Sequence, residues 1–485
     1  MRRLPFRRLA AGAAAATVLA GLLGANRPSA SPQLFSAGLL GNGATLLGVG
    51  PGEARGLAYL PGSTVLRLPG GAGLRYLPSG ANAPVNVPAD DRGALAAAAA
   101  DRAWLAAGTV PGRTPAERDA AASSLLLLRL LLRPGGAAIA AEAPYWAYVW
   151  PRDASFVAAA FHATGHAAES RAILGFLART QRPDGTWPAR SRPDGVPVGD
   201  GRPSQLDATG WVCWAAFMAT GQGTDRALLE RVWPMVRAAA GAAAGSLDAQ
   251  GLPPPGPDYW ERPEHAPTLG TAAALLAGLR GAARLAGAAG DPAAQVRFGR
   301  AAGRLGRAVH TRFAGPGTVY RHSLYGGGPD AAVAWLAPPF QPPDPAVRAA
   351  LTAAARRLAA GAGGGVVPGS PWRGGDPWTP ATAALALAEM ASGDRAVADR
   401  RLGWLLGHRT TLGAFPERVR RGDGAPRSVA PIAWTTAIVL LALTARDHPL
   451  PIPDGGTGLL PDPGPPGWVP HGVSSSSGPG RAVPI

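Results

Sequence analysis

The chain has 485 residues, of which 67 are glycine and 51 are proline, a share that by itself is typical of low-complexity chains. Because 47% of the residues are hydrophobic and only 16% are charged, the chain has enough apolar surface to fold into a globular protein. The formal net charge of +16 comes from arginine alone, and we interpret it as a compositional bias and not as a nucleic-acid surface. The single cysteine, Cys213, excludes an intramolecular disulfide and any cysteine-rich metal site.

Residues 1–30 have the pattern of an export signal. Several arginines precede an apolar run over residues 9–25, and small residues follow at a position suited to cleavage. An uncleaved membrane anchor is the alternative, because the run has about the minimum length of a membrane span. We therefore expect an exported protein, extracellular or in the cell envelope, that contacts a membrane only if the signal is not removed.

Two further segments flank the central region. Residues 31–113 contain short apolar pieces interrupted by glycine and proline, which predicts a small β-rich preface and a linker helix. Residues 448–485 are rich in proline, glycine and serine, which predicts a disordered tail. The tail is too short and too rich in turn residues to be an additional binding domain.

Residues 114–447 have a helical pattern. Thr114 and Glu117 form a predicted capping box with Pro115 at the first helical position. Within the later candidates, apolar residues recur at spacings of three and four. Together with the helix at Thr114 there are twelve candidates, and the others start near Arg152, Ala167, Ser204, Asp225, His265, Asp291, Asp330, Pro345, Thr379, Asp394 and Ser428.

Six helical hairpins either stack as an open solenoid or close into a double ring. No short sequence motif recurs, which disfavours the solenoid. Aromatic, acidic and Gly-Pro-rich stretches precede every second helix, and in a closed ring these alternate connections all lie at one end. We therefore predict an all-α barrel of inner and outer helices with one functional rim.

Tryptophan is the common element of the predicted rim. Flat aromatic side chains with a few polar groups make a pocket that suits sugars, which present both apolar faces and hydroxyl groups. Seven of the 14 tryptophans fall in these connections: Trp146, Trp150, Trp187, Trp260, Trp372, Trp378 and Trp434.

The polar residues of the rim favour chemistry by paired carboxylates. Metal-ligand clusters, a G-x-S-x-G nucleophile motif and a phosphate-binding loop are all missing from the sequence. What remains are four carboxylates and a guanidinium, from Arg152, Asp153, Asp207, Glu261 and Glu417. The alternative is that the two glutamates only stabilise helix entrances and that Arg152 and Asp153 form a structural ion pair.

An ordered set of motifs resembles the catalytic domain of the glucoamylase family, glycoside hydrolase family 15. These motifs are YVWPRDA, QLDATG, YWE followed by PTLGTAA, GGDPW, and FPE followed by PIAWT. The resemblance covers residues from about 114 to 446 and implies an (α/α) barrel of six hairpins. It implies that Glu261 is the general acid and Glu417 the general base.

The resemblance also implies a set of substrate contacts. Arg152 and Asp153 would bind hydroxyl groups of the terminal glucose, whereas Asp207 is either structural or faces the substrate. The implied aromatic lining is Tyr148, Trp150, Trp187, Trp260 and Trp378. The sequence departs from the family pattern at three positions, Ala208, Arg262 and Asp376.

We therefore expect an inverting, exo-acting glycoside hydrolase that releases glucose from the non-reducing ends of α-linked glucans or glucosides. It would act on a neutral oligo- or polysaccharide without a metal, cofactor, nucleotide or nucleic acid. Alternatives are a trehalase- or glucodextranase-like member of the same family and a secreted carbohydrate-binding pseudoenzyme.

Overall fold

A computed structural model describes residues 33–315, 319–360 and 363–454. The predicted export signal lies outside the described residues, and so does the predicted tail from residue 455 onward. Among the helices that are described, none combines the length and the apolar character needed to cross a membrane.

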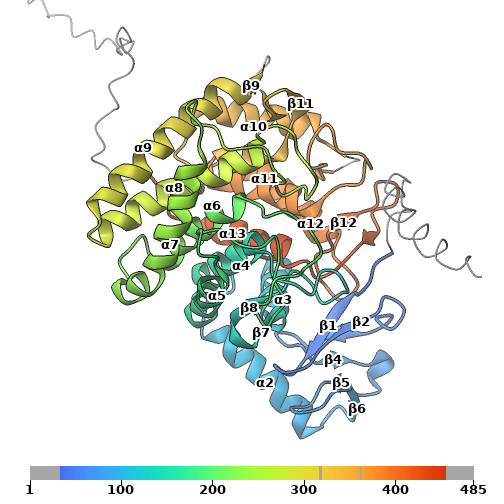
Figure 1. Cartoon of the computed structure of the whole chain (residues 1–485). Coiled ribbons are helices and arrows are strands. Elements are labelled where there is room, and N and C mark those ends of the chain that lie inside the picture. The colour runs from blue at the N-terminus through green and yellow to red at the C-terminus, as the bar shows by residue number, and fades with distance from the viewer. Residues whose placement is uncertain (1–32, 316–318, 361–362, 455–485) are drawn as a thin grey trace, which may run out of the picture.

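The N-terminal segment forms two small antiparallel sheets and one helix, at one end of the molecule (Figure 1). Its start runs along the last connection of the helical region, since Phe35 N donates to Ser428 O at 2.9 Å and Ser36 Oγ donates to Ala430 O at 2.6 Å. The expected β-rich preface is thus confirmed. Its elements are β1 (Gly38–Gly41) paired with β2 (Leu46–Val49), the sheet β3 (Ala58–Tyr59), β4 (Leu66–Arg67), β5 (Leu74–Tyr76) and β6 (Val85–Val87), the short 3-10 helix η1 (Pro69–Gly71), and α2 (Arg92–Ala106).

Eleven of the twelve predicted helices are α-helices. The first of them has the predicted capping box, because Thr114 and Glu117 each accept a hydrogen bond from the other's backbone N–H. The α-helices are α3 (Pro115–Leu131), α4 (Pro151–Ala163), α5 (Ala167–Thr180), α6 (Asp207–Ala219), α7 (Arg226–Ser246), α8 (Leu269–Ala288), α9 (Pro292–Ala308), α10 (Pro345–Arg357), α11 (Thr379–Ala391), α12 (Arg395–Gly407) and α13 (Ala433–Asp447).

The candidate near Asp330 is instead a six-residue 3-10 helix, η4 (Ala331–Leu336). Asp330 caps it as expected, since its side chain accepts from Ala332 N. The prolines at 338 and 339 leave no room for a longer helix, because proline has no N–H to donate to the preceding turn. η4 nevertheless takes the place of an inner helix.

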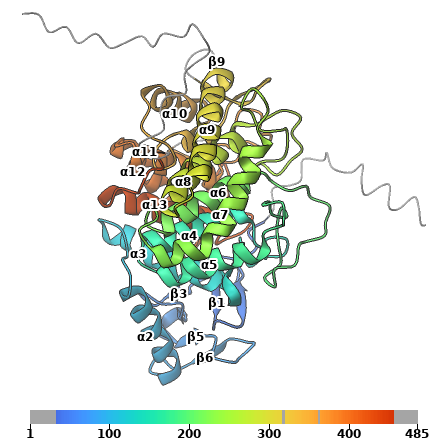
Figure 2. The ribbon, with the colours of Figure 1, turned by 60° about the vertical axis from the view of Figure 1, so that its left-hand side comes forward.

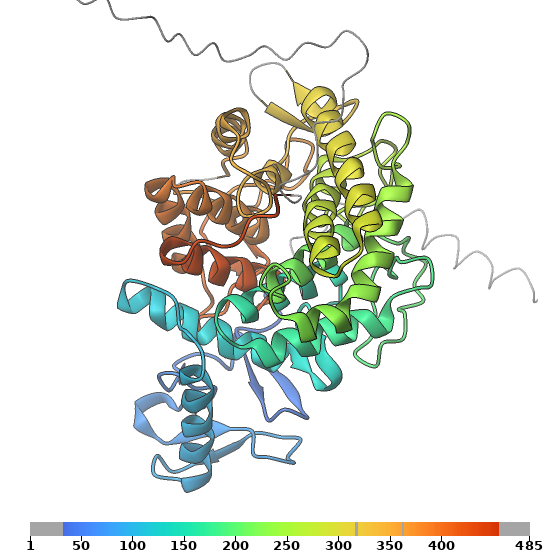
Figure 3. The same cartoon turned by 90° about the vertical axis from the view of Figure 1, so that its left-hand side faces the viewer.

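The six inner elements form a closed ring. Each packs on the next in the order α4, α6, α8, η4, α11 and α13, and α13 packs back on α4. The outer helices α5, α7, α9, α10 and α12 cover this ring, while α3 packs on α13. Figures 2 and 3 show the red and orange C-terminal helices facing the green and yellow helices, with the cyan first helix beside them. The predicted (α/α) barrel of six hairpins is confirmed, and the open solenoid is wrong.

Small residues allow the inner helices to approach closely. All 13 residues of α6 are buried, so this helix is in contact on every side. A Cβ on Gly278 of α8 would lie 2.4 Å from the Cα of Gly210 of α6, so neither position has space for a side chain.

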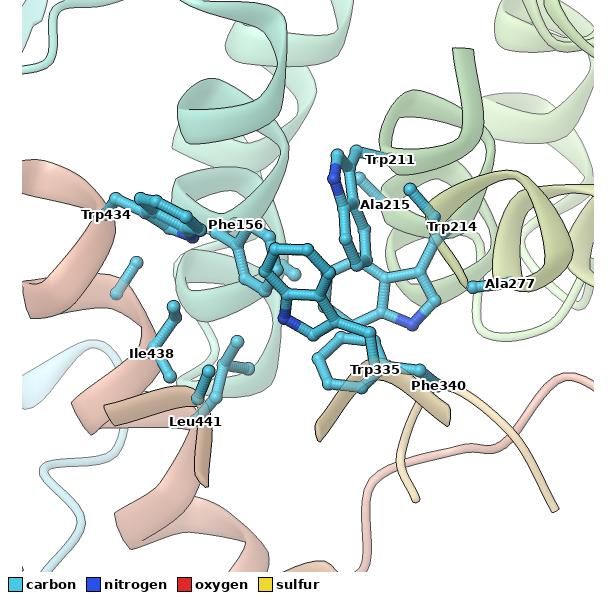
Figure 4. Close-up of a cluster of buried hydrophobic side chains, with 14 of the residues drawn as sticks. Phe156, Trp211, Trp214, Ala215, Ala277, Trp335, Phe340, Trp434, Ile438 and Leu441 are labelled. Carbon is cyan, nitrogen blue, oxygen red and sulfur yellow. The ribbon is translucent and has the colours of Figure 1, made fainter. Parts of the chain in front are cut away.

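The barrel axis is filled with aromatic side chains, which we call the aromatic plug (Figure 4). Phe156 lies 4.9 Å from Trp211 and 5.2 Å from Trp214 between ring centroids. The plug blocks passage along the axis, so the barrel is accessible from its ends only. Its members are Phe156, Trp211, Trp214, Trp335 and Phe340.

The remaining short elements lie in the connections between helices. They are β7 (Leu132–Arg133), η2 (Pro134–Gly136), β8 (Ala137–Ala138), the π-helical turn η3 (Val309–Phe313), the sheet of β9 (Ala314–Gly315), β10 (Val319–Ser323) and β11 (Gly326–Pro329), and the pair β12 (Arg418–Val419) and β13 (Pro426–Arg427).

Candidate active site

One cavity lies where the connections enter the inner helices. It has about 830 Å³ of space free of protein atoms, part of which is open to solvent. Its lining comes from the connections before α4, α6, α8, α11 and α13, so the predicted functional rim corresponds to a real cavity. The lining residues are Ala140, Tyr145, Trp146, Trp150, Arg152, Asp153, Arg190, Arg202, Tyr259, Trp260, Glu261, Trp372, Trp378, Pro380, Glu417, Arg418, Ile432 and Trp434.

The first turn of α4 brings Arg152 and Asp153 into the cavity. Pro151 is the first residue of this helix, where a missing N–H costs nothing. Arg152 is 4% exposed and donates to Gln205 at 2.9 Å and to Glu261 at 3.2 Å. Burial alone would lower the pKa of Arg152, but its carboxylate neighbours raise it, so the guanidinium stays charged.

Asp153 is buried at the cavity wall. Burial raises its pKa to about 6, although the adjacent Arg152 lowers it. Asp207 does not line the cavity. Its Oδ2 lies 3.5 Å from Arg152 Nη1, so Asp207 supports the arginine from behind. Burial also raises the pKa of Asp207, again opposed by Arg152.

Glu261 lies in a strained backbone conformation. Its φ is 54°, a region that is uncommon for residues other than glycine and that often occurs at functional sites. Its N–H donates to Asp258 O at 2.8 Å, which closes a tight turn. Two arginines hold the carboxylate, Arg152 on Oε1 and Arg202 on Oε2, the latter at 2.6 Å.

A buried polar network supports the turn that carries Glu261. Tyr259 Oη donates to Asp330 Oδ1 at 2.5 Å, and His322 Nδ1 lies 2.6 Å from Asp330 Oδ2. The His322 ring stacks on Trp260 with centroids 4.1 Å apart, and its Nε2 lies 3.1 Å from Glu264 Oε1. The aromatic wall beside Glu261 is therefore held by ionisable groups.

Two of the groups behind this turn have raised pKa values. Burial would lower the pKa of His322, but the hydrogen bond and charge of Asp330, with Asp258 and Glu264, raise it to about 9. Burial raises the pKa of Asp258 to about 7. His322 therefore carries a proton at neutral pH.

Glu417 has a different environment. Its backbone is fixed on both sides, because its N–H donates to Val429 O at 2.9 Å and its C=O accepts from Thr379 N at 3.1 Å. Ser428 Oγ donates to the carboxylate Oε2 at 2.5 Å. Arg418 Nε lies 3.7 Å from the same oxygen, beyond hydrogen-bonding distance.

Aromatic side chains make up much of the cavity wall. Six of the seven rim tryptophans line it, and four of these, Trp150, Trp260, Trp378 and Trp434, have buried indole N–H groups without an acceptor among the described residues. Trp211, Trp214 and Trp335 in the plug share this feature.

The cavity brings together most of the predicted site residues. Those that line it are Glu261, Glu417, Arg152, Asp153, Trp150, Trp260 and Trp378. Trp187 does not: it is 1% exposed and its indole donates to Leu177 O at 2.8 Å, so its predicted role in the wall is wrong. Tyr148 is also absent from the lining, because its ring packs under Arg190, whose Cζ is 4.7 Å from the centroid.

Other lining residues were not among the predicted site residues. Trp146, Trp372 and Trp434 were identified only as rim tryptophans. Tyr259 is the first residue of the YWE motif but was given no role, and Tyr145 lies shortly before the YVWPRDA motif. Arg190, Arg202 and Arg418 had no sequence signal, because arginine is frequent throughout the chain. Only Arg152 among the arginines was expected in the site.

No family model matches the sequence, and no curated protein does. Solved structures match the fold. A wild-type glycosidase has a TM-score of 0.58 and 22% identity, covering 67% of this chain and 95% of its own. A bacterial glucoamylase complexed with acarbose has a TM-score of 0.57 and 17% identity, covering 76% of this chain and 63% of its own.

A third match is the glucoamylase from Saccharomycopsis fibuligera, with a TM-score of 0.58 and 15% identity, covering 70% of this chain and 96% of its own. These likenesses agree with the ring of inner and outer helices described above. The chain has the glucoamylase fold.

Proposed function

We propose that the chain is a glycoside hydrolase of the glucoamylase type, which removes glucose from the non-reducing ends of α-linked glucans or glucosides with inversion. The main observation that supports this proposal is that Glu261 and Glu417, which come from separate connections, line the same tryptophan-rich cavity. The matched glycosidases and glucoamylases share the fold and support the proposal.

The floor of the cavity favours attack at a chain end. Tyr259 and Trp434 line the cavity and also pack against Trp335 of the aromatic plug, with centroids 4.7 Å and 6.2 Å away. A glucan therefore has no path through the barrel. Only a terminal sugar would fit against the floor, which corresponds to exo action.

In the proposed reaction, the Glu261 carboxyl gives its proton to the glycosidic oxygen as the bond from that oxygen to C1 breaks. Water attacks C1 from the opposite face and gives a proton to Glu417. Inverting glycosidases separate these two carboxyls by about 6.5 to 9.5 Å, which leaves room for the water. Arg152 and Asp153 would bind hydroxyls of the terminal glucose.

The decisive experiment follows the anomer that is released. The mature chain is incubated with maltose oligomers, isomaltose and trehalose, and the first product is observed by NMR. β-Glucose from any of them supports an inverting α-glucosidase and identifies the linkage, which distinguishes the glucoamylase, glucodextranase and trehalase types. α-Glucose released from the non-reducing end of a maltose oligomer or of isomaltose would contradict inversion. Trehalose has α-glucose as its leaving group, so inversion gives α- and β-glucose in equal amounts, and α-glucose without β-glucose would be the contradicting result.

A carbohydrate-binding pseudoenzyme is the second candidate. The observation in its favour is that Arg152 and Arg202 contact the two carboxylate oxygens of Glu261, so both oxygens already have a guanidinium partner in this structure. Sugar binding by calorimetry, without turnover of any substrate, would support this candidate over the enzyme.

A further inference from the structure

Exposed aromatic side chains gather at the cavity. Among the residues that the structure describes, three aromatic side chains are at least 46% exposed: Tyr325 at 82%, Tyr145 at 72% and Phe35 at 46%. Tyr145 lines the cavity, and Phe35 packs on Trp146, another lining residue, with ring centroids 5.9 Å apart. We call Phe35, Tyr145 and Trp146 the outer aromatic surface.

The backbone presents Tyr145 to solvent in a fixed way. Its φ is 70°, a conformation that is costly for a residue other than glycine and persists only where surrounding contacts impose it. Its C=O accepts a hydrogen bond from Arg190 Nη1 at 2.9 Å. Arg190 is 5% exposed and packs on the rings of Tyr148 and Trp150. A buried arginine thus holds the turn that carries Tyr145 at the edge of the cavity.

Phe35 comes from the N-terminal segment and not from the barrel. Its N–H donates to Ser428 O at 2.9 Å, and the neighbouring Ser36 Oγ donates to Ala430 O at 2.6 Å. Ser428 in turn donates to Glu417, so Phe35 is anchored on the connection that carries the proposed base. The N-terminal segment therefore adds an aromatic ring beside the cavity that the barrel alone lacks.

A bound sugar chain must leave the cavity on its solvent side, because the aromatic plug closes the floor. Exposed rings at that edge would gain buried apolar area when the flat face of a sugar packs on them. Apolar side chains that gather beside a site, unlike isolated ones, mark interaction surfaces. Tyr325 is such an isolated side chain, since it does not line the cavity.

We infer that the outer aromatic surface binds the sugar units that follow the terminal glucose, so that the preferred substrate is a chain of three or more units and not a disaccharide. This inference rests on the proposed function. The surface has no charged side chain, which suits neutral sugar units. Because its contacts lie away from the bond that breaks, they are equally strong in the ground state and the transition state, and they should lower KM without changing kcat.

Substrate length tests the inference. The mature chain is given oligomers of two to six glucose units in the linkage that it cleaves, and kcat/KM for glucose release is compared between hexamer and dimer. We expect a ratio of about 10-fold, as two stacked sugar units would give, with the difference in KM. Equal kcat/KM at every length, or hydrolysis of trehalose alone, would overturn the inference while the glycoside hydrolase still stands.

Four variants assign the ratio to the ring faces. Phe35→Leu and Tyr145→Leu keep an apolar side chain but remove the flat ring, and each should lower the ratio by about three-fold. Phe35→Tyr retains a ring and should keep the natural ratio. Tyr325→Leu removes an exposed ring outside the cavity and should keep it as well. A natural ratio in Phe35→Leu and Tyr145→Leu, or an equal loss in Tyr325→Leu, would overturn the inference.

Binding separates this inference from the proposed function. If none of the oligomers and no trehalose releases glucose, the proposed function fails. Calorimetry with the hexamer then tests the outer aromatic surface alone: the natural protein should bind about three-fold more tightly than Phe35→Leu. Equal affinities would overturn the surface too.

Discussion

Glu261 and Glu417 have different neighbours. Arg152 and Arg202 contact Glu261, whereas the hydroxyl of Ser428 donates to Glu417. Two guanidinium groups therefore hold the first carboxyl. A hydroxyl donates to the second, and its arginine neighbour, Arg418, lies 3.7 Å away. This difference makes their proposed roles separable by experiment.

We expect Glu261→Gln and Glu417→Gln each to lower kcat on a natural α-glucoside by about 10² to 10⁴, the usual contribution of a general acid or base. α-Glucosyl fluoride needs no protonation of its leaving group. Glu261→Gln should therefore hydrolyse the fluoride at close to the natural rate, whereas Glu417→Gln should not. Glu230→Gln on the exposed side of α7 is the control. Equal losses on the fluoride would refute the assignment of Glu261 as the acid.

The sequence predicted these two glutamates and Arg152, but not the other residues that hold the glutamates. The surrounding motifs identified Glu261 and Glu417. Arg190, Arg202 and Arg418 could not be distinguished from the many other arginines of the chain. Trp187 was expected in the cavity wall because it lies in a connection, but a tryptophan in a connection can also be buried in the core. A backbone φ of 54° at Glu261 also has no signature in the residue itself.

At the level of elements, helix type was predicted correctly for every candidate but η4, whereas the entrances were predicted less closely. Asp330 caps η4, and a proline stands in the first turn of α4 and of α11. By contrast, α6, α8 and α13 begin three to five residues after their predicted starts near Ser204, His265 and Ser428. The length of η4 depends on the prolines that follow it, and its place in the ring depends on packing against α8 and α11. A capping residue alone does not distinguish a 3-10 helix from an α-helix.

The network around His322 joins β10, the entrance of η4 and the turn of Glu261. The folded protein holds the His322 proton more tightly than the unfolded chain, with a pKa of about 9 against an ordinary 6.5. Its contribution to the free energy of unfolding is therefore complete below pH 6.5, decreases as pH rises and is lost above about pH 9. Burial also raises the pKa of Asp258 to about 7, so its contribution to the free energy of unfolding likewise decreases as pH rises, but at lower pH than that of His322.

We expect the stability of the protein to fall between pH 7 and 9.5 by up to about 3 kcal/mol through this histidine. Urea unfolding at several pH values measures the loss. His322→Gln should be less stable at pH 7, and its free energy of unfolding should depend less on pH between 7 and 9.5. His310→Gln, a partly exposed histidine outside the network, should keep the natural slope. An unchanged slope in His322→Gln would show that another group causes it.

At the scale of the whole molecule, the barrel closes where its last helix, α13, packs on its first two helices, α3 and α4. We call the contact between α3 and α13 the seam. Arg446 of α13 is 5% exposed and donates to Glu117 of α3 at 2.7 Å and to Asp399 of α12. Beside it, Arg113 donates to Asp447 at 3.0 Å, but both side chains are exposed. One seam thus contains a buried ion pair and an exposed one.

These two pairs give a matched test of closure. Arg446→Met keeps the apolar stem but removes the cationic partner of Glu117, whose side chain is only 12% exposed and keeps only the backbone N–H donors of its capping box. We expect a loss of about 2 to 4 kcal/mol in the free energy of unfolding, because an unpaired buried charge is costly. Arg113→Met should cost less than about 1 kcal/mol, since its pair is screened by water. Both values come from urea unfolding, and equal losses would mean that burial at this seam does not determine the strength of closure.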